Sequence, residues 1–113
     1  MLDTPAFGSA AVAAPHHLAS EAGRAILAEG GNAIEAMVAM AATIAVVYPH
    51  MNGIGGDGFW LVHEPGGTMH GIEACGPAGS LATIERYRAK GYDSIPARGP
   101  GAALTVAGAV GGW

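Results

Sequence analysis

Three glycines, Gly53, Gly55 and Gly58, are spaced G-x-G-x-x-G in the stretch YPHMNGIGGDGFW. In dinucleotide-binding proteins this spacing follows a strand and opens a helix, whose N-terminal amides bind the pyrophosphate. Here the order is reversed, because the helical pattern of Asn32 to Val47 precedes the glycines and the strand-like run FWLVH follows them. We therefore expect no nucleotide cofactor, and we expect glycines with positive φ that pack tightly between a helix and a strand.

Cys75 is the only cysteine in the chain, so it can form neither an internal disulfide nor a cysteine pair for a metal. It stands beside Gly76 at the end of a predicted strand, where a thiol could act as a nucleophile if its surroundings activated it. A lone cysteine is more often a small buried hydrophobic side chain, and we favour a passive role in lining a pocket. Asp57, within the glycine stretch, is interpreted as a residue that caps or turns the backbone.

The five histidines do not form a known metal-binding pattern. None has a partner at i, i+4 on a helix or a C-x-x-C companion, and only two, His63 and His70, could approach each other, across a hairpin. We therefore predict no metal site. The other three histidines are His16, His17 and His50.

Helical spacing predicts two consecutive helices. Apolar residues recur at this spacing in HLASEAGRAILAEGGN, and Gly30 with Gly31 supplies a C-terminal stop. Asn32 is a good N-cap for the second helix, and Glu35 can complete a capping box. Apolar residues occupy both faces of this second helix, so we expect it to lie between a sheet and further structure.

The remaining elements are shorter. FWLVH and MHGIEAC predict a hairpin around EPGGT, in which Pro65 and Gly66 favour a type II turn. The other expected elements are a helix beginning at Thr83 and stopped by Gly91, with Ile84 and Tyr87 inward, and two short strands, at Ala10 to Ala14 and near Leu104 to Val106.

Composition narrows the class of protein. The chain has 113 residues, 50% of them hydrophobic and 12% charged, and its net charge of -4 argues against nucleic acid as a partner. The apolar helix is shorter than the roughly 20 residues that cross a bilayer, so we predict no membrane span. The N-terminus carries Asp3 and Pro5 where a signal peptide would be basic and then apolar, and we expect the cytoplasm rather than export.

Five motifs together resemble the N-terminal part of the gamma-glutamyltranspeptidase family. HHLASEAG is similar to the family's HPLAS-x-AG, GGNAIEAMVA to GGNAxDAAVA, VYP to VxP, GIGGDGF to GIGGGGF, and VAGAVGGW to VPGAVxGW. They occur in the family's order and spacing, over roughly residues 11–113. The resemblance implies an α+β chain that forms the N-terminal fragment of an αββα N-terminal nucleophile hydrolase fold.

The resemblance also implies how the protein works. Family members are precursors that cleave themselves, and the threonine exposed at the start of the small chain acts as nucleophile while its amine acts as base. Because this threonine lies outside the chain, we expect no catalytic residue within residues 1–113, and Thr43, Thr68, Thr83 and Thr105 are not assigned that role. The implied partners are an amide or peptide substrate of the glutathione type and the remainder of the precursor.

One motif departs from the family. After the hairpin, gamma-glutamyltranspeptidases carry D-x-R-E-x-A-P, whose arginine binds the α-carboxylate of the γ-glutamyl group through two parallel hydrogen bonds. The ungapped match here is EACGPAG, which places Cys75 at the arginine position and Gly76 at the glutamate position. The chain thus resembles the divergent, acylase-like members, and Cys75 is our candidate substrate-binding residue.

These observations lead to one main hypothesis and two alternatives. Residues 1–113 are predicted to be a partial N-terminal segment of one gamma-glutamyltranspeptidase-like domain, truncated at the C-terminus, because the hairpin and one or two isolated strands cannot cover both faces of the second helix. The segment is expected to be inactive alone, because the catalytic threonine implied by the resemblance lies outside it. The first alternative is a non-catalytic structural or interaction module derived from the family. The second is a thiol enzyme that uses Cys75.

Overall fold

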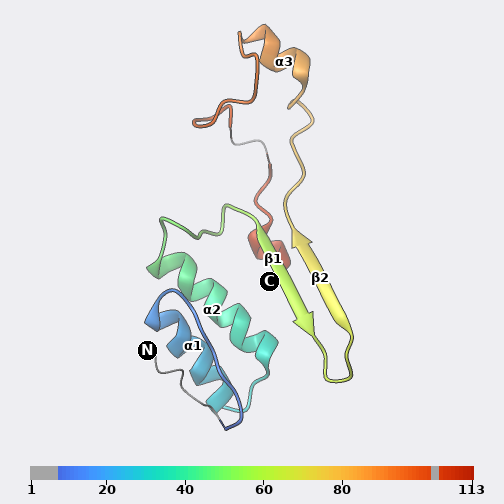
Figure 1. The fold of residues 1–113 in the computed structure, drawn as a ribbon. Coiled ribbons are helices and arrows are strands. Elements are labelled where there is room, and N and C mark those ends of the chain that lie inside the picture. The colour runs from blue at the N-terminus through green and yellow to red at the C-terminus, as the bar shows by residue number, and fades with distance from the viewer. Residues whose placement is uncertain (1–7, 103–104) are drawn as a thin grey trace, which may run out of the picture. The chain divides into compact units, whose positions relative to one another are not determined.

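A computed structural model describes residues 8–102 and 105–113, which form two compact units, one ending at Gly53 and one running from Ile54 to Trp113 (Figure 1). The first unit contains two helices, α1 (His17–Ala28) and α2 (Ala33–Val47). The second contains strands β1 (Gly58–His63) and β2 (Met69–Ala74) and the short helices α3 (Ile84–Ala89) and α4 (Ala109–Gly112). The predicted α+β class is confirmed.

Helix α1 ends at the predicted glycine pair. Gly30 has φ +90°, its amide donates to the carbonyl of Leu27, and the amide of Gly31 donates to the carbonyl of Ile26 at 2.9 Å. This pair of hydrogen bonds is a Schellman motif, in which a left-handed glycine satisfies the last free carbonyls of the helix.

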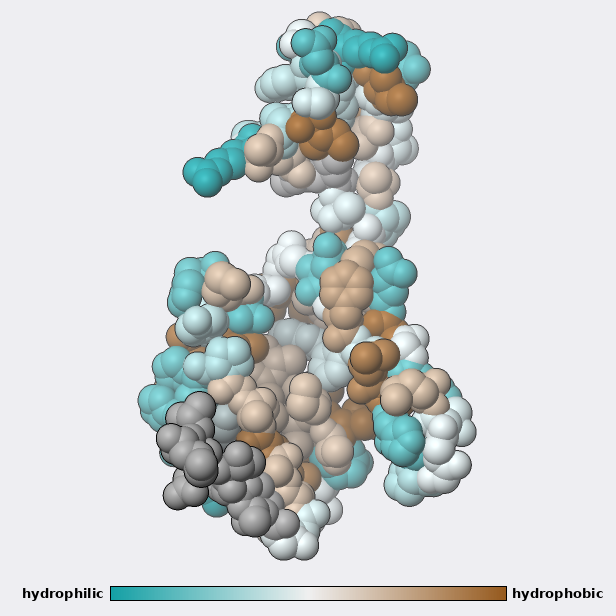
Figure 2. Space-filling model, in the orientation of Figure 1, coloured by the Kyte–Doolittle hydropathy of each residue, from teal (hydrophilic) through white to brown (hydrophobic). Residues whose placement is uncertain are grey.

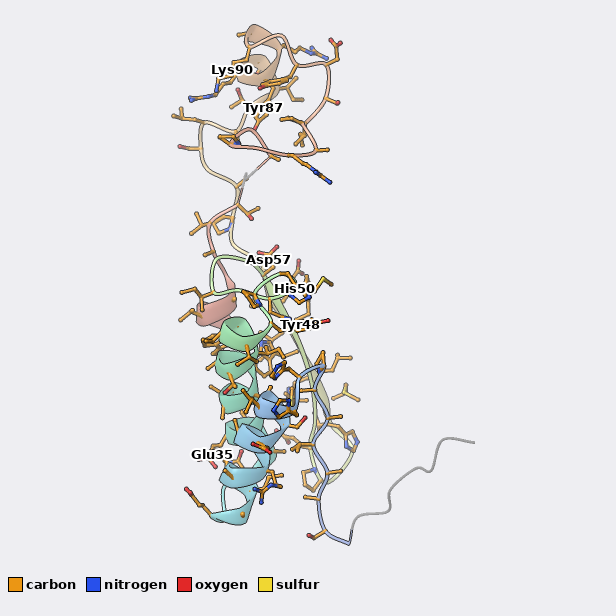
Figure 3. All side chains as sticks on the ribbon, turned by 90° about the vertical axis from the view of Figure 1, so that its left-hand side faces the viewer. Glu35, Tyr48, His50, Asp57, Tyr87 and Lys90 are labelled. Atoms are coloured by element: carbon orange, nitrogen blue, oxygen red, sulfur yellow. The ribbon has the colours of Figure 1, made fainter. Side chains whose placement is uncertain are left out.

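Helix α2 begins with the predicted capping box. The Asn32 side chain accepts the amides of Ile34 (2.9 Å) and Glu35 (3.0 Å), and the Glu35 carboxylate accepts the Asn32 amide at 2.7 Å. Figure 3 shows Glu35 at this first turn. The cap fixes where α2 starts, only a few residues after α1 ends, so the two helices fold back on each other.

Small side chains form the contact between α1 and α2. Ala19 and Gly23 are the buried residues of α1, and Ala36 and Met40 are those of α2. Other apolar residues of α2 are exposed, among them Ile34 (55%) and Val46 (77%). Helix α1 therefore covers only part of α2, and a further layer on α2 stays a prediction.

The predicted strand at Ala10–Ala14 is wrong. These residues form no strand, because a strand needs a paired neighbour and the described part of the first unit has helices only. The segment packs on α1 instead: a Cβ built on Gly23 would lie 3.3 Å from a methyl group of Val12.

The predicted hairpin is confirmed, and its register is fixed by the turn. Strands β1 and β2 are antiparallel, with His63 paired to Met69 next to the turn and Gly58 paired to Ala74 at the open end. In the turn, the amide of Gly67 donates to the carbonyl of Glu64 and Gly66 has φ +128°, as a type II turn requires at its third residue.

Helix α3 is short and belongs to the segment that follows the hairpin. Thr83 caps it by accepting the Arg86 amide, and Gly91, with φ +79°, ends it as predicted. Tyr87 is half-buried and its hydroxyl donates to the carbonyl of Gly101 at 2.6 Å. The inward placement of Ile84 is wrong, since this side chain is 66% exposed.

The C-terminal part contains less regular structure than predicted. Leu104 lies outside the described residues, and Thr105 forms only an isolated bridge with Ala78 rather than a strand. The last residues form α4, which packs on β1 and β2. Among the helices of the described residues, none is both long enough and apolar enough to cross a bilayer.

Replacing Asn32 by Ala removes the side chain that caps α2, and we expect the free energy of unfolding to fall by about 1 kcal/mol. The measurement is urea-induced unfolding of the full-length protein. Asn52→Ala, at an exposed position outside the helices, is the matched control and is expected to change stability little. Equal losses in both variants would contradict a capping role.

Candidate functional site at the open end of the hairpin

The hairpin register brings Cys75 together with Asp57. Gly58 pairs with Ala74 as the last pair of the ladder, and Asp57 and Cys75 are the next residues outward on the two strands. The charge of Asp57 acts on the Cys75 thiol, as expected of two residues that continue this register. Side chains alternate between the two faces of a strand, and these two residues therefore share a face with the next-but-one pair, Phe59 and Glu73. We call this face, with Asp57, Phe59, Leu61, Glu73 and Cys75, the open face.

The other face of the hairpin is backed by α4. It carries Trp60 and Ala74, and a Cβ built on Gly112 of α4 would lie 3.1 Å from the Trp60 ring nitrogen and 2.5 Å from the Ala74 Cβ. The open face lacks such a backing within the described part of its unit. Phe59 is 73% exposed and Leu61 is 83% exposed.

Electrostatics keep the Cys75 thiol neutral. The side chain is free and half-buried, and this partial burial raises its pKa above the ordinary value. The negative charges of Asp57 and then Glu73 raise the same pKa further, because a thiolate beside two carboxylates is disfavoured. A nucleophilic cysteine needs surroundings that lower its pKa, so the burial and the neighbouring carboxylates of Cys75 argue against the thiol-enzyme alternative.

Histidines of the hairpin lie far from Cys75. His70 is five residues from Cys75 along β2, which is about 17 Å in a strand. His63 and His70, the two histidines that a hairpin could have brought together, lie on opposite faces, because His70 pairs with Val62. His70 instead contacts the Glu64 carboxylate at 3.2 Å. Within residues 8–102 and 105–113, no three potential ligands are grouped around a possible metal position.

The glycine stretch before β1 differs in detail from the prediction. Gly53, Gly55 and Gly58 have no positive φ, and a Cβ on Gly53 or Gly55 would meet no atom within 4 Å. The chain leaves α2 through ordinary turns, in which the amides of Met51 and Asn52 donate to the carbonyl of Tyr48, so left-handed residues are unnecessary there. Figure 3 shows Tyr48 beside His50 after α2, with ring centroids 4.1 Å apart.

The glycine stretch is anchored through a backbone carbonyl. The carbonyl of Gly56 accepts the amides of Gly108 (3.0 Å) and Ala109 (2.9 Å). The residue that follows it is Asp57, labelled in Figure 3. This anchor holds the position from which the Asp57 carboxylate acts on Cys75.

The four threonines that were excluded as nucleophiles take part in local backbone structure. Thr43 donates to the carbonyl of Ala39 within α2 at 2.8 Å, and Thr83 caps α3. Thr68 accepts the Glu64 amide through its carbonyl in the hairpin turn, and Thr105 forms the bridge to Ala78.

Comparison with known proteins identifies the family. The sequence model of the Gamma-glutamyltranspeptidase family matches residues 19–113. Over 97% of this chain, the structure resembles the crystal structure of Helicobacter pylori gamma-glutamyltranspeptidase with a TM-score of 0.83 and 33% identity, covering 32% of that chain. The enzyme from Pseudomonas nitroreducens, complexed with L-DON, gives a TM-score of 0.80 at 34% identity, with 95% of this chain and 32% of that chain covered. The fold is thus that of N-terminal nucleophile hydrolases, and the chain belongs to the gamma-glutamyltranspeptidase family.

Two curated relatives that match most of the chain are named as proenzymes of hydrolases. The chain is 68% identical over 100 residues to the oxamate amidohydrolase proenzyme of Klebsiella pneumoniae, covering 88% of this chain. It is 48% identical over 103 residues to the glutathione hydrolase-like YwrD proenzyme of Bacillus subtilis, covering 90% of this chain. In both cases the match spans 19% of the relative's length.

Sequence reasoning located Cys75 but missed its neighbour. The approach of Asp57 could have been found by counting outward from the Pro65–Gly66 turn, because the residue opposite any strand position follows from the register. Our interpretation of Asp57 as a residue that caps or turns the backbone did not use the hairpin register. The role of Cys75 in binding substrate stays a prediction.

Because its pKa is raised, Cys75 has less thiolate than a free thiol at any given pH, and we expect slow alkylation by iodoacetamide. Asp57→Asn removes one negative charge, lowers the pKa and should accelerate alkylation about two- to fivefold at pH 8. Asp93→Asn, an exposed carboxylate in the same unit, is the control. An unchanged rate in Asp57→Asn would contradict the assigned effect of the Asp57 charge on the thiol.

Proposed function

We propose that this chain is the N-terminal part of a precursor that matures into an amide hydrolase acting on oxamate. The observation that carries the proposal is the 68% identity to an oxamate amidohydrolase proenzyme, against 48% to a glutathione hydrolase-like proenzyme. The two matches cover 88% and 90% of the chain, so the difference reflects similarity rather than the length compared.

The proposed reaction uses a threonine outside residues 1–113. Its hydroxyl oxygen attacks the amide carbon of oxamate while its own amine takes the proton. The C–N bond then breaks, the nitrogen leaves as ammonia with that proton, and an ester links the acyl group to the threonine. Water hydrolyses the ester, which releases oxalate and restores the threonine.

The chemistry at residue 75 supports a small substrate. In a γ-glutamyl amide, four bonds separate the scissile carbonyl carbon from the carbon of the α-carboxylate, whereas in oxamate the two carbons are bonded directly. A group that binds the distant carboxylate is therefore needed for γ-glutamyl substrates and not for oxamate. Cys75 is a neutral thiol with two carboxylates beside it, which cannot bind a carboxylate as an arginine does.

Exposure of apolar residues favours a part of a larger enzyme over a self-sufficient module. The buried hydrophobic residues of the described part are all small except Met40: Ala19, Ala36, Met40, Ala74 and Ala109. Figure 2 shows hydrophobic side chains open to solvent over the hairpin. A domain that functions alone covers such surface, so we propose that the remainder of the precursor packs on it.

The experiment compares substrates in the mature full-length enzyme. We expect kcat/KM for ammonia release from oxamate to exceed that for hydrolysis of γ-glutamyl-p-nitroanilide by at least about a hundredfold, because the α-carboxylate of the γ-glutamyl group lacks its charged partner. A higher kcat/KM for the γ-glutamyl substrate would overturn the proposal.

Cys75→Ser serves as the control for a thiol mechanism. With Cys75 as pocket lining, the variant is expected to keep kcat within about threefold of the unmodified enzyme, whereas loss of a nucleophile lowers kcat by roughly 10³ or more. A loss of that size with intact folding would revive the thiol-enzyme alternative.

Maturation is tested separately. Intact mass and N-terminal sequencing of the protein from its native source should find two chains, the smaller beginning with threonine, because the nucleophile becomes a free N-terminus only after cleavage. Mild heating of the purified precursor should raise the two-chain fraction without added protease. A single uncut chain with full activity would contradict the mechanism.

A further inference from the structure

The strand end that carries Cys75 is crossed from behind by a distant segment. The amide of Val106 donates to the carbonyl of Pro77 at 3.0 Å, and the amides of Gly108 and Ala109 donate to the carbonyl of Gly56. Residues 106–109 therefore tie together the two backbone stretches that flank Asp57 and Cys75. We call residues 106–109 the backing segment.

Two glycines allow the crossing. A Cβ on Gly76 would collide with the backbone carbonyl group of Val106, and a Cβ on Gly108 would collide with the carbonyl oxygen of Ala74 and lie 2.7 Å from the Gly76 nitrogen. The obstacles are backbone atoms, which cannot rotate away as a side chain can. A Cβ at position 76 or 108 can be accommodated only if the strand end or the backing segment moves.

Backbone conformation does not explain these glycines. Gly108 has φ -105°, and Gly76 does not belong to the glycines with positive φ, so other residues could adopt both conformations. Close approach of two backbones is then the reason that these positions lack a side chain.

The geometry of the crossing determines the direction of any displacement. Gly76 faces the backing segment, because a Cβ on it would meet the Val106 carbonyl group, while Cys75, which follows the last paired residue of β2, is on the open face. A side chain inserted at the crossing pushes the strand end away from the backing segment. Cys75 would then shift toward the open face without being altered itself.

We propose that Gly76 and Gly108 are positioning residues, which set how far Cys75 projects from the open face and, where that face lines the substrate site of the full-length enzyme, determine the size of substrate accepted. The effect of the two glycines on the size of the substrate rests on the function proposed above. The structural part of the proposal does not depend on that function: the crossing determines the burial of the thiol and its distance from Asp57.

The test substitutes each glycine by alanine in the full-length protein and follows the thiol first. Displacing Cys75 outward reduces its burial, which lowers its pKa, so Gly108→Ala and Gly76→Ala are expected to accelerate alkylation by iodoacetamide at least about threefold at pH 8. Gly111→Ala and Gly79→Ala are the matched controls, because a Cβ at either position meets no atom within 4 Å. Equal alkylation rates in all four folded variants would overturn the proposal.

Kinetics provide the second readout. Narrowing the pocket without touching the nucleophile should raise KM for oxamate about fivefold and leave kcat within about twofold. Equal losses of kcat in test and control variants would indicate general damage and overturn the positioning role. If oxamate is not a substrate, the oxamate proposal fails while the alkylation rates still decide the role of the crossing.

Two measurements guard against variants that do not fold. Gly112→Ala presses on the Trp60 ring, which can rotate away, and on the Ala74 Cβ, which moves only with its backbone, and should accelerate alkylation in the same direction. In the unmodified protein, hydrogen exchange at the amides of Val106 and Gly108 should be slow, as their hydrogen bonds require. Free exchange at both amides would overturn the proposal without any variant.

Discussion

The antiparallel register of β1 and β2 is the constraint on which the candidate site depends. Because the Pro65–Gly66 turn fixes the pairing, it also fixes that Asp57 stands opposite Cys75 and that both share a face with Glu73. A slip of one residue would move Cys75 to the face backed by α4 and remove it from the two carboxylates. Burial raises the pKa of the thiol first, and the pairing adds the two carboxylates that raise this pKa further. The distance of the thiol from the hairpin histidines and its place on the open face also follow from the pairing.

Glycine serves two physical purposes in this chain. At Gly30 and Gly91 it provides left-handed conformations that end helices, which local sequence can specify. At Gly76 and Gly108 it allows one backbone to cross another at close range, which involves residues about thirty positions apart. Gly108 lies in the closing VAGAVGGW stretch, one of the motifs that carry the resemblance to the family, whereas Gly76 stands where the family motif has a glutamate.

The described part buries little of its apolar surface, and this bears on whether it functions alone or as part of a larger protein. Met40 is its one large buried hydrophobic side chain, while Phe59, Leu61 and Val46 are mostly exposed. The chain spans 19% of the length of two curated relatives, both described as proenzymes. These facts are consistent with our proposal that α2 and the apolar residues of the open face, Phe59 and Leu61, are covered by the remainder of a precursor.

Local sequence determined the elements whose signals lie within a few residues: the capping box of Asn32 and Glu35, the glycine stop of α1, the hairpin turn, and the cap and stop of α3. It failed at Ala10–Ala14 and at Ile84, because strand formation and burial depend on partners that are distant in sequence. The family followed from motifs in order, and Cys75 from its place in one of them. Only the tertiary structure showed that Asp57 and Glu73 act on this thiol and that residues 106–109 back it, because register and crossing join segments that no local pattern connects.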